Sequence, residues 1–555
     1  MKTRRRPARG PRALAVALFL LAPMAARAAI VRVDILNDTG IEDGSAAHPY
    51  NTIQEGISHA GSGDRVLVAP GLYKETLLMK DGVSVQGAGA RTTIIDGTGL
   101  QNSVVTFNGT RSSPILSGFT ITGGAGDVAR EVAGVPVRIG GGVLVLNSSP
   151  VITQNVITGN RIEDGYCLGG GIYVYSALST PQILENVIAL NRALSATVPG
   201  AGEGGGIYVV AKNGGVIISG NTVQLNEAAT GGGILVQHIV AGAAQIDRNL
   251  IRGNAAAQGA GVLTHNPDGS GTTILNNLIT GNASPAPGAR GGGVRASAEG
   301  SGSFSIRSNT IAGNSVASDG GGLWLDDALS TASSVVANNI LAGNGASQGG
   351  GIDHQLFHGT IRKNTLHANA GGDLSGGGSA TLIDNALADP QFLALEPGSY
   401  QLAPGSPCID TADAPSSPPG DIASFPRPFD GDFDLTARAD RGAYEYPSGD
   451  VAGLQALSGG SIDWLALPGQ ESFNLYRGSL PRLAATGEHT QDPLVEPLAA
   501  RICGLTPADL PWADPVALPP GGAVFYLATL VEDSWEGGLG ETSLGLPRAN
   551  LHPCP

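Results

Sequence analysis

Aliphatic residues follow a glycine triplet at regular intervals along the middle of the chain. Each regular unit begins with a triplet or a close variant of one, and the residue that follows is Val143, Ile172, Ile207, Ile234, Val262, Val294, Leu323 or Ile352. The pattern fades at Ser379, and the step between successive positions averages about 29 residues. A unit of this size cannot bury its own apolar face, so it must stack on its neighbours.

A single unit consists of three short β runs joined by corners. In the unit that starts at Gly204, apolar runs at 207–210, 216–218 and 222–225 are separated by glycine and asparagine. None of these runs has the 3.6-residue periodicity of a helix. Three short strands per unit, stacked in register, predict an all-β fold: a right-handed parallel β-helix of about eleven coils.

A second signal, Asn-x-aliphatic-x-x-Asn, recurs between the triplets. Its asparagine pairs are Asn155–Asn160, Asn186–Asn191, Asn221–Asn226, Asn249–Asn254, Asn277–Asn282, Asn309–Asn314, Asn339–Asn344 and Asn364–Asn369. Asparagine tolerates the left-handed backbone region of a corner, and identical stacked amides can hydrogen-bond as a ladder. The glycine triplets suit corners where the backbones of successive coils approach closely.

Side chains alternate across a strand, so the first residue after each triplet should point inward and the second and fourth outward. The second positions are Leu144, Tyr173, Tyr208, Leu235, Leu263, Arg295, Trp324 and Asp353. The fourth positions are Leu146, Tyr175, Val210, Gln237, His265, Ser297, Asp326 and Gln355. This outward column is the candidate functional surface.

Residues 1–28 are predicted to be a cleaved export signal. Five arginines precede an apolar run at 13–21, and Ala-Arg-Ala follows at 26–28. The run is too short to span a bilayer, and no later stretch has the length of a transmembrane segment. Cleavage removes Lys2 and six arginines, so the net charge falls from −15 to −22. Such an acidic chain excludes nucleic acid as a partner. We expect it outside the cell or on its outer surface, with the periplasm as an alternative.

Residues 29–139 form a less regular entry module, before the regular coils of residues 140–387. A short helix is expected at 52–60, with Ile53 and Ile57 on one face. The runs at 65–71 and 83–87 are predicted to be strands closed by turns. The run from Asp43 to Gly97 resembles the entry module of secreted bacterial β-helix proteins. That resemblance implies that the helix caps the open end of the stack.

Residues 388–446 change character and become rich in Asp and Pro. The segments 389–392, 404–410 and 440–445 resemble the closing segment of the choice-of-anchor family of bacterial surface proteins. In that family the next element is a variable attachment device. Residues 450–555 instead resemble a fibronectin type III-like β-sandwich, with runs at 461–464, 473–478 and 525–529 spaced as strands B, C and F.

Four cysteines in an exported chain point to disulfide chemistry. Cys503 and Cys554 share the C-terminal domain and are predicted to pair. Cys167 and Cys408 lie roughly 35 Å apart along a straight stack, so no bond between them is expected.

Alternate carboxylates at Asp430, Asp432 and Asp434 could supply oxygen ligands to Ca²⁺. The spacing is not that of an EF-hand, since Leu435 and Arg441 occupy the positions of its invariant Gly and Glu. A solvated turn is the alternative interpretation, and no other cofactor is required.

Aromatic residues gather in the outward column. Tyr173, Tyr175 and Tyr208 come from adjacent coils, and Trp324 lies further along the same column. Aromatic faces suit sugar rings, which present apolar C–H patches. The alternatives are an aromatic ladder that stiffens the sheet and a cover for a loop.

Carboxylates follow on the same face. Asp326 and Asp353 fall on neighbouring coils two residues out of register, which places them ~8 Å apart, within the range for an inverting hydrolase. Candidate partners within the next two coils are Asp327, His358 and Lys363.

The scaffold resembles that of pectate lyases and polygalacturonases, but their motifs are incomplete. The Asn-Thr-Asp motif is replaced by Asn309-Thr310-Ile311, and Gly-His-Gly by Phe357-His358-Gly359. The sequence therefore favours non-catalytic binding of a polysaccharide or a cell-surface protein. A polysaccharide lyase or glycoside hydrolase, and a structural spacer, are the alternatives.

Overall fold

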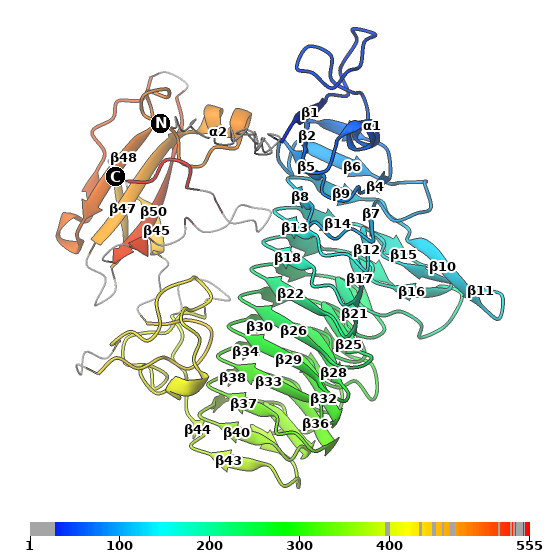
Figure 1. The fold of residues 1–555 in the computed structure, drawn as a ribbon. Helices are drawn as coiled ribbons and strands as arrows, with labels where there is room; N and C mark the ends of the chain where they lie inside the picture. Colours follow the sequence, from blue (N-terminus) through cyan, green and yellow to red (C-terminus); the bar gives the residue numbers. More distant parts are fainter. Residues whose placement is uncertain are drawn as a thin grey trace, which may run out of the picture.

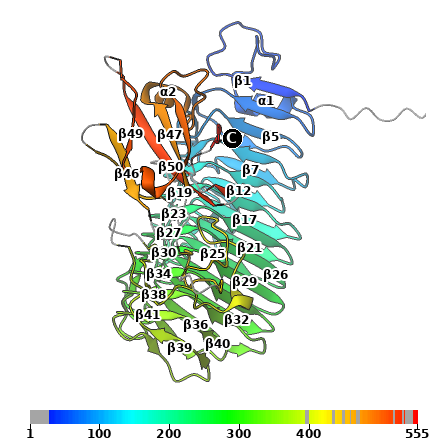
Figure 2. The same ribbon diagram turned by 90° about the vertical axis from the view of Figure 1, so that its left-hand side faces the viewer.

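The coils stack into a rod with two further units packed along its side (Figures 1 and 2). This computed structural model describes residues 28–393, 400–431 and 436–446, and residues 451–554 except 458–459, 467–471, 520–521, 533–534, 537–538, 540–547 and 549. The predicted export signal lies almost wholly outside these ranges. None of the helices in the described ranges has the length and apolar character that crossing a bilayer requires.

Three long parallel sheets form the walls of the rod, and each coil contributes one strand to each in turn. Sheet I follows the glycine triplets and contains β4 (Leu77–Leu78), β7 (Val105–Asn108), β12 (Val143–Leu146), β17 (Ile172–Ala177), β21 (Ile207–Lys212), β25 (Ile234–His238), β28 (Val262–Asn266), β32 (Val294–Gly300), β36 (Leu323–Ser330), β39 (Ile352–Leu356) and β42 (Leu374–Ser375). Sheet II contains β1 (Ile30–Val33), β2 (Arg65–Val68), β5 (Ser84–Gly87), β8 (Ile115–Ser117), β13 (Val151–Thr153), β18 (Gln182–Leu184), β22 (Gly215–Ser219), β26 (Gly242–Asp247), β29 (Ser270–Leu275), β33 (Ser303–Arg307), β37 (Val335–Ala337), β40 (Thr360–Arg362) and β43 (Thr381–Ile383). Sheet III contains β3 (Gly71–Tyr73), β6 (Thr93–Asp96), β9 (Thr120–Thr122), β14 (Val156–Thr158), β19 (Val187–Ala189), β23 (Thr222–Gln224), β27 (Leu250–Arg252), β30 (Leu278–Thr280), β34 (Thr310–Ala312), β38 (Ile340–Ala342), β41 (Thr365–His367) and β44 (Ala386–Leu387). The parallel β-helix predicted from the repeats is confirmed.

Shorter strands lie at the corner before the triplets. They are β10 (Asp127–Val132), β11 (Val135–Ile139) and β16 (Tyr166–Leu168) in one sheet, β15 (Arg161–Ile162), β20 (Arg192–Ala193) and β24 (Glu227–Ala228) in a second, and β31 (Ala283–Ser284) with β35 (Ser315–Val316). The hairpin β10–β11, which the repeat pattern did not predict, projects from the rod beside sheet I (Figure 1).

Glycine is required in the triplets by backbone contact between coils. Gly204 has a φ of 64°, in the left-handed region. A Cβ on Gly205 or Gly206 would lie 2.6 or 2.5 Å from a carbonyl oxygen of the next coil. Any side chain at these two positions would therefore push the coils apart.

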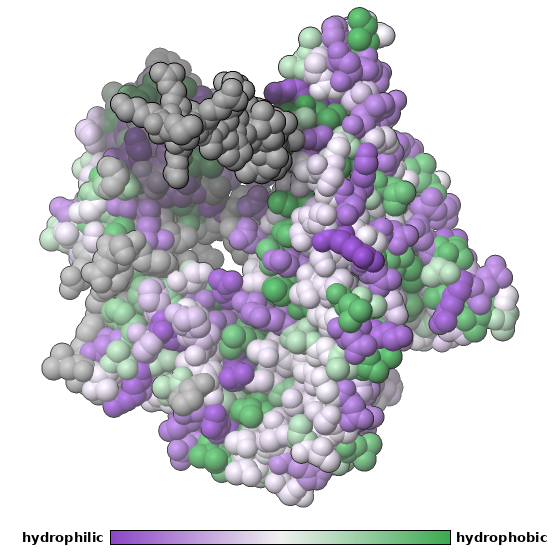
Figure 3. Space-filling view, viewed as in Figure 1, coloured by the Kyte–Doolittle hydropathy of each residue, from purple (hydrophilic) through white to green (hydrophobic). Residues whose placement is uncertain are grey.

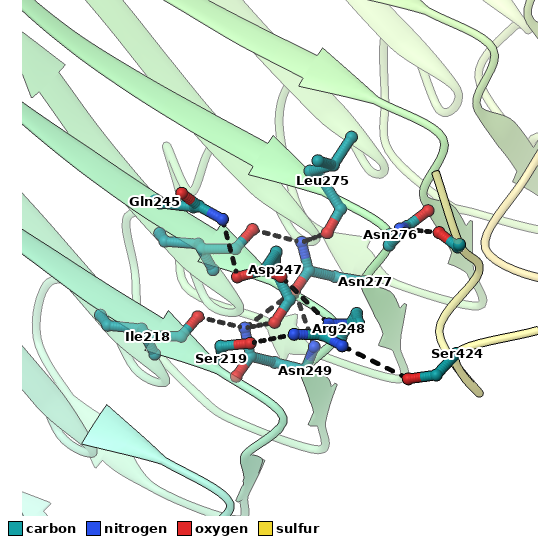
Figure 4. Close-up of polar contacts among 12 residues, drawn as sticks. Ile218, Ser219, Gln245, Asp247, Arg248, Asn249, Leu275, Asn276, Asn277 and Ser424 are labelled. Carbon is teal, nitrogen blue, oxygen red and sulfur yellow. Dashed lines mark hydrogen bonds and ion pairs between the residues drawn. The ribbon is translucent and has the colours of Figure 1, made fainter. Parts of the chain in front are cut away.

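Two columns of buried asparagines run through the stack, as predicted. Asn249 shows the pattern: its Nδ2 donates to Ile218 O, Asp247 O and Asn277 Oδ1, each at 2.9 Å (Figure 4). Its Oδ1 accepts the backbone N–H and the side-chain amide of Asn221 from the preceding coil, at 2.9 and 3.0 Å. The donors and the acceptor of the buried amide are thus satisfied by its own coil and the two neighbouring coils.

The asparagines were expected to adopt the left-handed backbone conformation at the corners, and this expectation is wrong. The positive φ angles fall on the residue before each ladder asparagine, such as Gln154, Glu185 and Arg248 at 56°, 53° and 53°. The ladder asparagine therefore contributes its side chain, and its predecessor makes the turn.

The N-terminal end of the rod is capped as the entry module predicted. Helix α1 (Ile53–His59) begins at Thr52, whose hydroxyl accepts the Glu55 N–H, and it buries Ile53 and Ile57 over the first coil. The apolar core then continues without a break to Leu366.

The segment after the last coil folds back along sheet III instead of continuing the rod (Figure 1). Its apolar side chains Leu402, Ile409 and Tyr446 pack on Ile340 and two alanines of β34 and β38. The short 3₁₀ helix η1 (Ala414–Ser416) lies in this segment.

Polar contacts dock this segment at the corner between sheets II and III. Arg248 Nη1 donates to Ser424 Oγ at 3.3 Å, and Asn276 Nδ2 donates to Gly420 O at 2.7 Å (Figure 4). The guanidinium of Arg427 is fully buried, pairs with Glu445 at 2.6 Å and donates to Asn276 Oδ1 at 3.2 Å. The segment is therefore part of the same packed body as the coils.

The C-terminal unit is a two-sheet antiparallel sandwich. One sheet contains β45 (Ala452–Ala456), β46 (Ser461–Leu465) and β49 (Trp512–Ala513), and the other β48 (Ala500–Leu505), β47 (Ser472–Ser479), β50 (Val524–Glu532) and β51 (Trp535–Glu536). Helix α2 (Leu480–Thr486) and the 3₁₀ helix η2 (Pro507–Asp509) lie in connections between strands. The sandwich stands beside the N-terminal half of sheet III (Figures 1 and 2). Its core includes Trp464, Phe473 and Phe425 of the closing segment.

The cysteines are arranged as predicted. Cys503 and Cys554 form a disulfide, with Cα atoms 5.8 Å apart. Cys167 and Cys408 are buried free thiols within the described part of the chain, and Cys408 lies beside Thr365, many coils from β16.

Removing one rung of the ladder should destabilise the coils. Asn249→Ala leaves the buried N–H of Asn221 without its acceptor, so the free energy of unfolding should fall by about 3 kcal/mol. Chemical denaturation followed by circular dichroism measures the change. Gln245→Ala, an exposed amide four positions before Asn249, is the matched control. Equal midpoints for the two variants would contradict a structural role for the ladder.

Candidate functional site

The outer face of sheet I is divided into a covered half and an open half. In the first coils, Val137 and Ile139 of β11 pack over Leu144, Tyr173 and Tyr208. Further along, the outward positions become polar and reach the surface, beginning at Gln237. A candidate site on this face can therefore lie only beyond the hairpin.

The aromatic column predicted to bind sugar is mostly buried. Tyr173 and Tyr208 are 8% and 4% exposed, and their rings meet edge to face at 5.5 Å. Burial raises the pKa of Tyr173 to about 12 and that of Tyr208 further. Tyr175 is half-buried against the same cluster. The expectation that Tyr173 and Tyr208 face solvent is wrong, because both lie in a buried apolar cluster that also includes Val137 and Ile139 of the hairpin.

Trp324 is also buried, at 6% exposure, but by a different set of neighbours. The guanidinium carbons of Arg290 and Arg295 lie 5.4 and 4.8 Å from its ring centre. Arg290 pairs with Asp319 at 3.1 Å, and Arg295 donates to Gln258 Oε1 at 2.7 Å. The indole face is occupied by cations, so it is not free to stack on a sugar.

A depression of about 220 Å³ lies between the covered tyrosines and Trp324. Its lining consists of Glu203, Thr230, Leu235, Gln237, Leu263, His265, Arg295 and Ser297. Leu235 and Leu263 form an apolar floor, and the other side chains rise around it from three adjacent columns. We call this depression the sheet I groove.

The polar groups of the groove are held by hydrogen bonds to one another. Tyr208 Oη donates to Gln237 Oε1 at 2.7 Å, and His265 Nδ1 lies 3.1 Å from Ser297 Oγ. Burial and the charge of Arg290 lower the pKa of Arg295 below its ordinary value. The groove thus offers a carboxylate, an amide, an imidazole and a guanidinium over a small apolar patch.

The predicted carboxylate pair lies beside Trp324. Asp353 pairs in register with Trp324, but the register shifts between Trp324 and Asp326, which pairs with Leu356. The two carboxylates thus lie on neighbouring strands, and the regular pairing from which ~8 Å was expected is interrupted between them. Asp353 is only 3% exposed, and burial, together with the charge of Asp319, raises the pKa of its carboxyl. Asp326 is half-buried.

The remaining predicted catalytic residues do not join this pair. Asp327 points to the opposite side of the strand, where its Oδ1 accepts the His358 N–H at 2.6 Å and lies 3.5 Å from that ring. Burial raises the pKa of Asp327, and the bond from His358 opposes that shift. Lys363 lies at the corner between sheets II and III, where it pairs with Asp384 at 3.3 Å. Lys363 is therefore not a partner of Asp326 and Asp353.

The predicted calcium ligands cannot be placed as a set. Asp432 and Asp434 lie outside the described residues, while Asp430 has a polar partner. Among the described residues, no three His, Cys, Asp or Glu side chains gather as metal ligands would.

Some residues of the groove were not predicted, because strand alternation identified only the second and fourth positions after each triplet. The residue immediately before each triplet belongs to a third column. Parallel backbone β-bridges join the members of this column from coil to coil: Glu203, Thr230, Gln258, Arg290, Asp319 and Gln348. These residues could have been identified from the sequence, because each one directly precedes a triplet.

A second depression, of about 580 Å³, lies on the outer face of sheet II. Glycine, alanine, serine and threonine line most of it, including Gly215, Ala243, Gly271 and Thr273. Figure 3 shows this face pale over β26, β29 and β33, with little strongly polar or apolar surface. It offers no titratable group and is not the candidate site.

The buried tyrosines should contribute to stability. Tyr208→Ala removes a side chain that packs on Tyr173 and Leu235, so the free energy of unfolding should fall by about 3 kcal/mol. Tyr208→Phe loses only the hydroxyl bond to Gln237 and should cost about 1 kcal/mol. Thermal unfolding of the two variants measures both effects. A Tyr208→Ala protein as stable as wild type would contradict the burial of this column.

Sequence similarity between this chain and known proteins is low. No curated protein matches the chain. Among solved structures, pectate lyase Pel9A is 12% identical with a TM-score of 0.43, over 75% of this chain and 96% of that one. XylC, in a complex with xylose, is 11% identical with a TM-score of 0.39, over 75% and 98%. The GH136 lacto-N-biosidase from Eubacterium ramulus is 12% identical with a TM-score of 0.35, over 65% and 68%.

The family described as right handed beta helix region matches residues 78–297 and again 241–387. Together these matches span more than half of the chain. They coincide with the part in which three parallel sheets repeat coil by coil. The chain belongs to the right-handed β-helix family.

Proposed function

We propose that the sheet I groove binds a glycan, and that the chain is an exported binding protein. The observation that carries this proposal is the polar lining of the groove over an apolar floor of Leu235 and Leu263. Sugar rings combine hydroxyl groups with apolar C–H faces, and a concave site with few convergent polar groups matches both features.

The charge of the groove supports a ligand that carries hydroxyl or carboxylate groups. Arg295 and His265 provide donors, while Glu203 and Gln237 provide acceptors. The arginine is half-buried, so its bonds to a ligand form in a region of reduced solvent screening. Tyr173, Tyr208 and Trp324 support this surface from below and do not touch the ligand.

Removing groove side chains should weaken glycan binding without unfolding the rod. His265→Ala is expected to reduce affinity about tenfold, a loss of ~1.4 kcal/mol, because a donor is lost from a half-buried position. Titration calorimetry against a panel of neutral and uronic-acid polysaccharides measures the change. Gln245→Ala, on the outer face of sheet II, is the matched control and should bind as wild type. Unchanged affinity in His265→Ala, or a wild-type chain that binds no glycan in the panel, would contradict the proposal.

Hydrolysis is the second candidate function, and the placement of Asp326 and Asp353 on neighbouring strands favours it. A carboxyl with a raised pKa near a second carboxylate is what an inverting acid–base pair requires. Asp353 is almost completely buried, so substrate reaches its carboxyl only after neighbouring side chains move. This requirement makes catalysis the weaker proposal.

One variant separates the two candidates. If the pair is catalytic, Asp353→Asn should abolish the release of reducing ends while glycan affinity stays within about twofold of wild type. Reducing-end assays alongside calorimetry test this outcome. A wild-type chain that binds glycan but releases no reducing ends would leave binding as the function.

The C-terminal sandwich fits an attachment role. We infer a fibronectin type III-like module, supported by β46, β47 and β50, which form where strands B, C and F were expected. It follows a closing segment that resembles the choice-of-anchor type. On this proposal, the sandwich and closing segment hold the chain at a surface and leave the sheet I groove free.

A further inference from the structure

The two ends of the rod differ in how they are closed. At the N-terminal end, α1 buries the first coil under Ile53 and Ile57. At the other end, the last coil (residues 374–387, here called the end coil) lies at the tip of the rod in both views, and no described element lies beyond it (Figures 1 and 2). A stack that ends without a cap exposes both its core and its strand edges.

Core positions of the end coil are exposed to solvent. Leu382 pairs with Ile361 and Leu387 with Leu366, both of which are completely buried. Yet Leu382 is 50% exposed and Leu387 is 71% exposed, because no further coil covers them. Two leucines of the core column are thus left at the surface.

The backbone of the end coil is also unpaired on its outer side. Thr381 N donates to Gly359 O of the preceding coil, at 2.9 Å. In a parallel strand the next residue faces the other way, so the N–H and C=O of Leu382 point out of the end of the rod. β42, β43 and β44 together present three such edges around the exposed leucines.

The described segments that follow the coils are not placed to cover the end. Residues 388–393, 400–431 and 436–446 lie along sheet III, and the sandwich stands at the opposite half of the rod (Figure 1). Within the described ranges, the end coil is therefore open to contact by another molecule.

The charge of the end coil favours a second copy of the same chain. The whole chain carries a net charge of −15, but residues 374–387 contain a single charged side chain, Asp384. That carboxylate is already paired with Lys363 at 3.3 Å. Two identical ends can therefore meet without the repulsion that the rest of the surface would impose.

We propose that two copies of the chain dimerise end to end through their end coils. A two-fold axis across the end makes the facing strands antiparallel, so all three edges can pair at once and the exposed leucines cover each other. A single peptide strand would cover only one edge. Because α1 caps the other end, the assembly stops at a dimer and does not grow into a fibre.

Light scattering coupled to size exclusion tests this proposal on the purified full chain. The wild type should elute with twice its 55.9 kDa chain mass (less the export signal, if that has been cleaved) at about 50 µM. Leu382→Asp and, separately, Leu387→Asp should elute at the single-chain mass, because each places a charge in the contact. Both should keep the wild-type circular dichroism, since these side chains are already solvent-exposed.

Leu329→Asp is the matched control, a 72% exposed leucine on the side of the rod in β36. It should remain dimeric. A wild-type chain that stays at single mass up to about 100 µM would overturn the proposal and leave the end coil to a different protein. A dimer that survives both end-coil variants would overturn it as well, because the contact would then lie elsewhere.

Discussion

Buried asparagine amides connect each coil of this rod to the coils on either side. The side chain of Asn249 bonds to the coils on both sides through its amide group, and only its bond to Asp247 O lies within its own coil. A buried amide without partners costs several kcal/mol, so no coil is stable alone. The ladder thereby fixes the register of all three sheets, and with it the position of every outward side chain.

The same requirement explains where the closing segment binds. The residue before each ladder asparagine turns the chain, so its side chain stands at the corner between sheets II and III. At two of these positions, Arg248 and Asn276 reach out to Ser424 and Gly420. The corner residues thus hold the inner ladder in place on one side and present docking groups on the other. Coils and closing segment form one body because they share these corners.

Much of the fold could be predicted because its determinants are local and repeated. The triplets, the asparagine pairs and the inward aliphatic residues each identify a position in the coil without knowledge of any other coil. The cap at Ile53 and Ile57 and the Cys503–Cys554 bond were likewise predictable from neighbouring residues. The return of residues 400–446 along sheet III was not, since it depends on contacts between residues far apart in the sequence, such as Arg427 and Asn276.

The candidate site was predicted less well, for a physical reason. Alternation along a strand says which way a side chain points but not what lies above it. Tyr208 points outward as expected and is nevertheless buried, because it packs in an apolar cluster with neighbours such as Tyr173 and Leu235. Lys363 was grouped with Asp353 by sequence distance, although one corner of the coil separates them.

The hairpin β10–β11 enters the chain just before the triplet at 140–142, where the coil closes and the next begins. An insertion at that corner leaves the three stacked strands untouched, so the rod tolerates it at any level. Its residues Val137 and Ile139 share a buried cluster with Leu144 and Tyr173, so the level of the insertion affects which outward residues of sheet I are buried. In this architecture, the location of a binding surface can move along the rod by relocating one loop, while the residues that build the core stay the same.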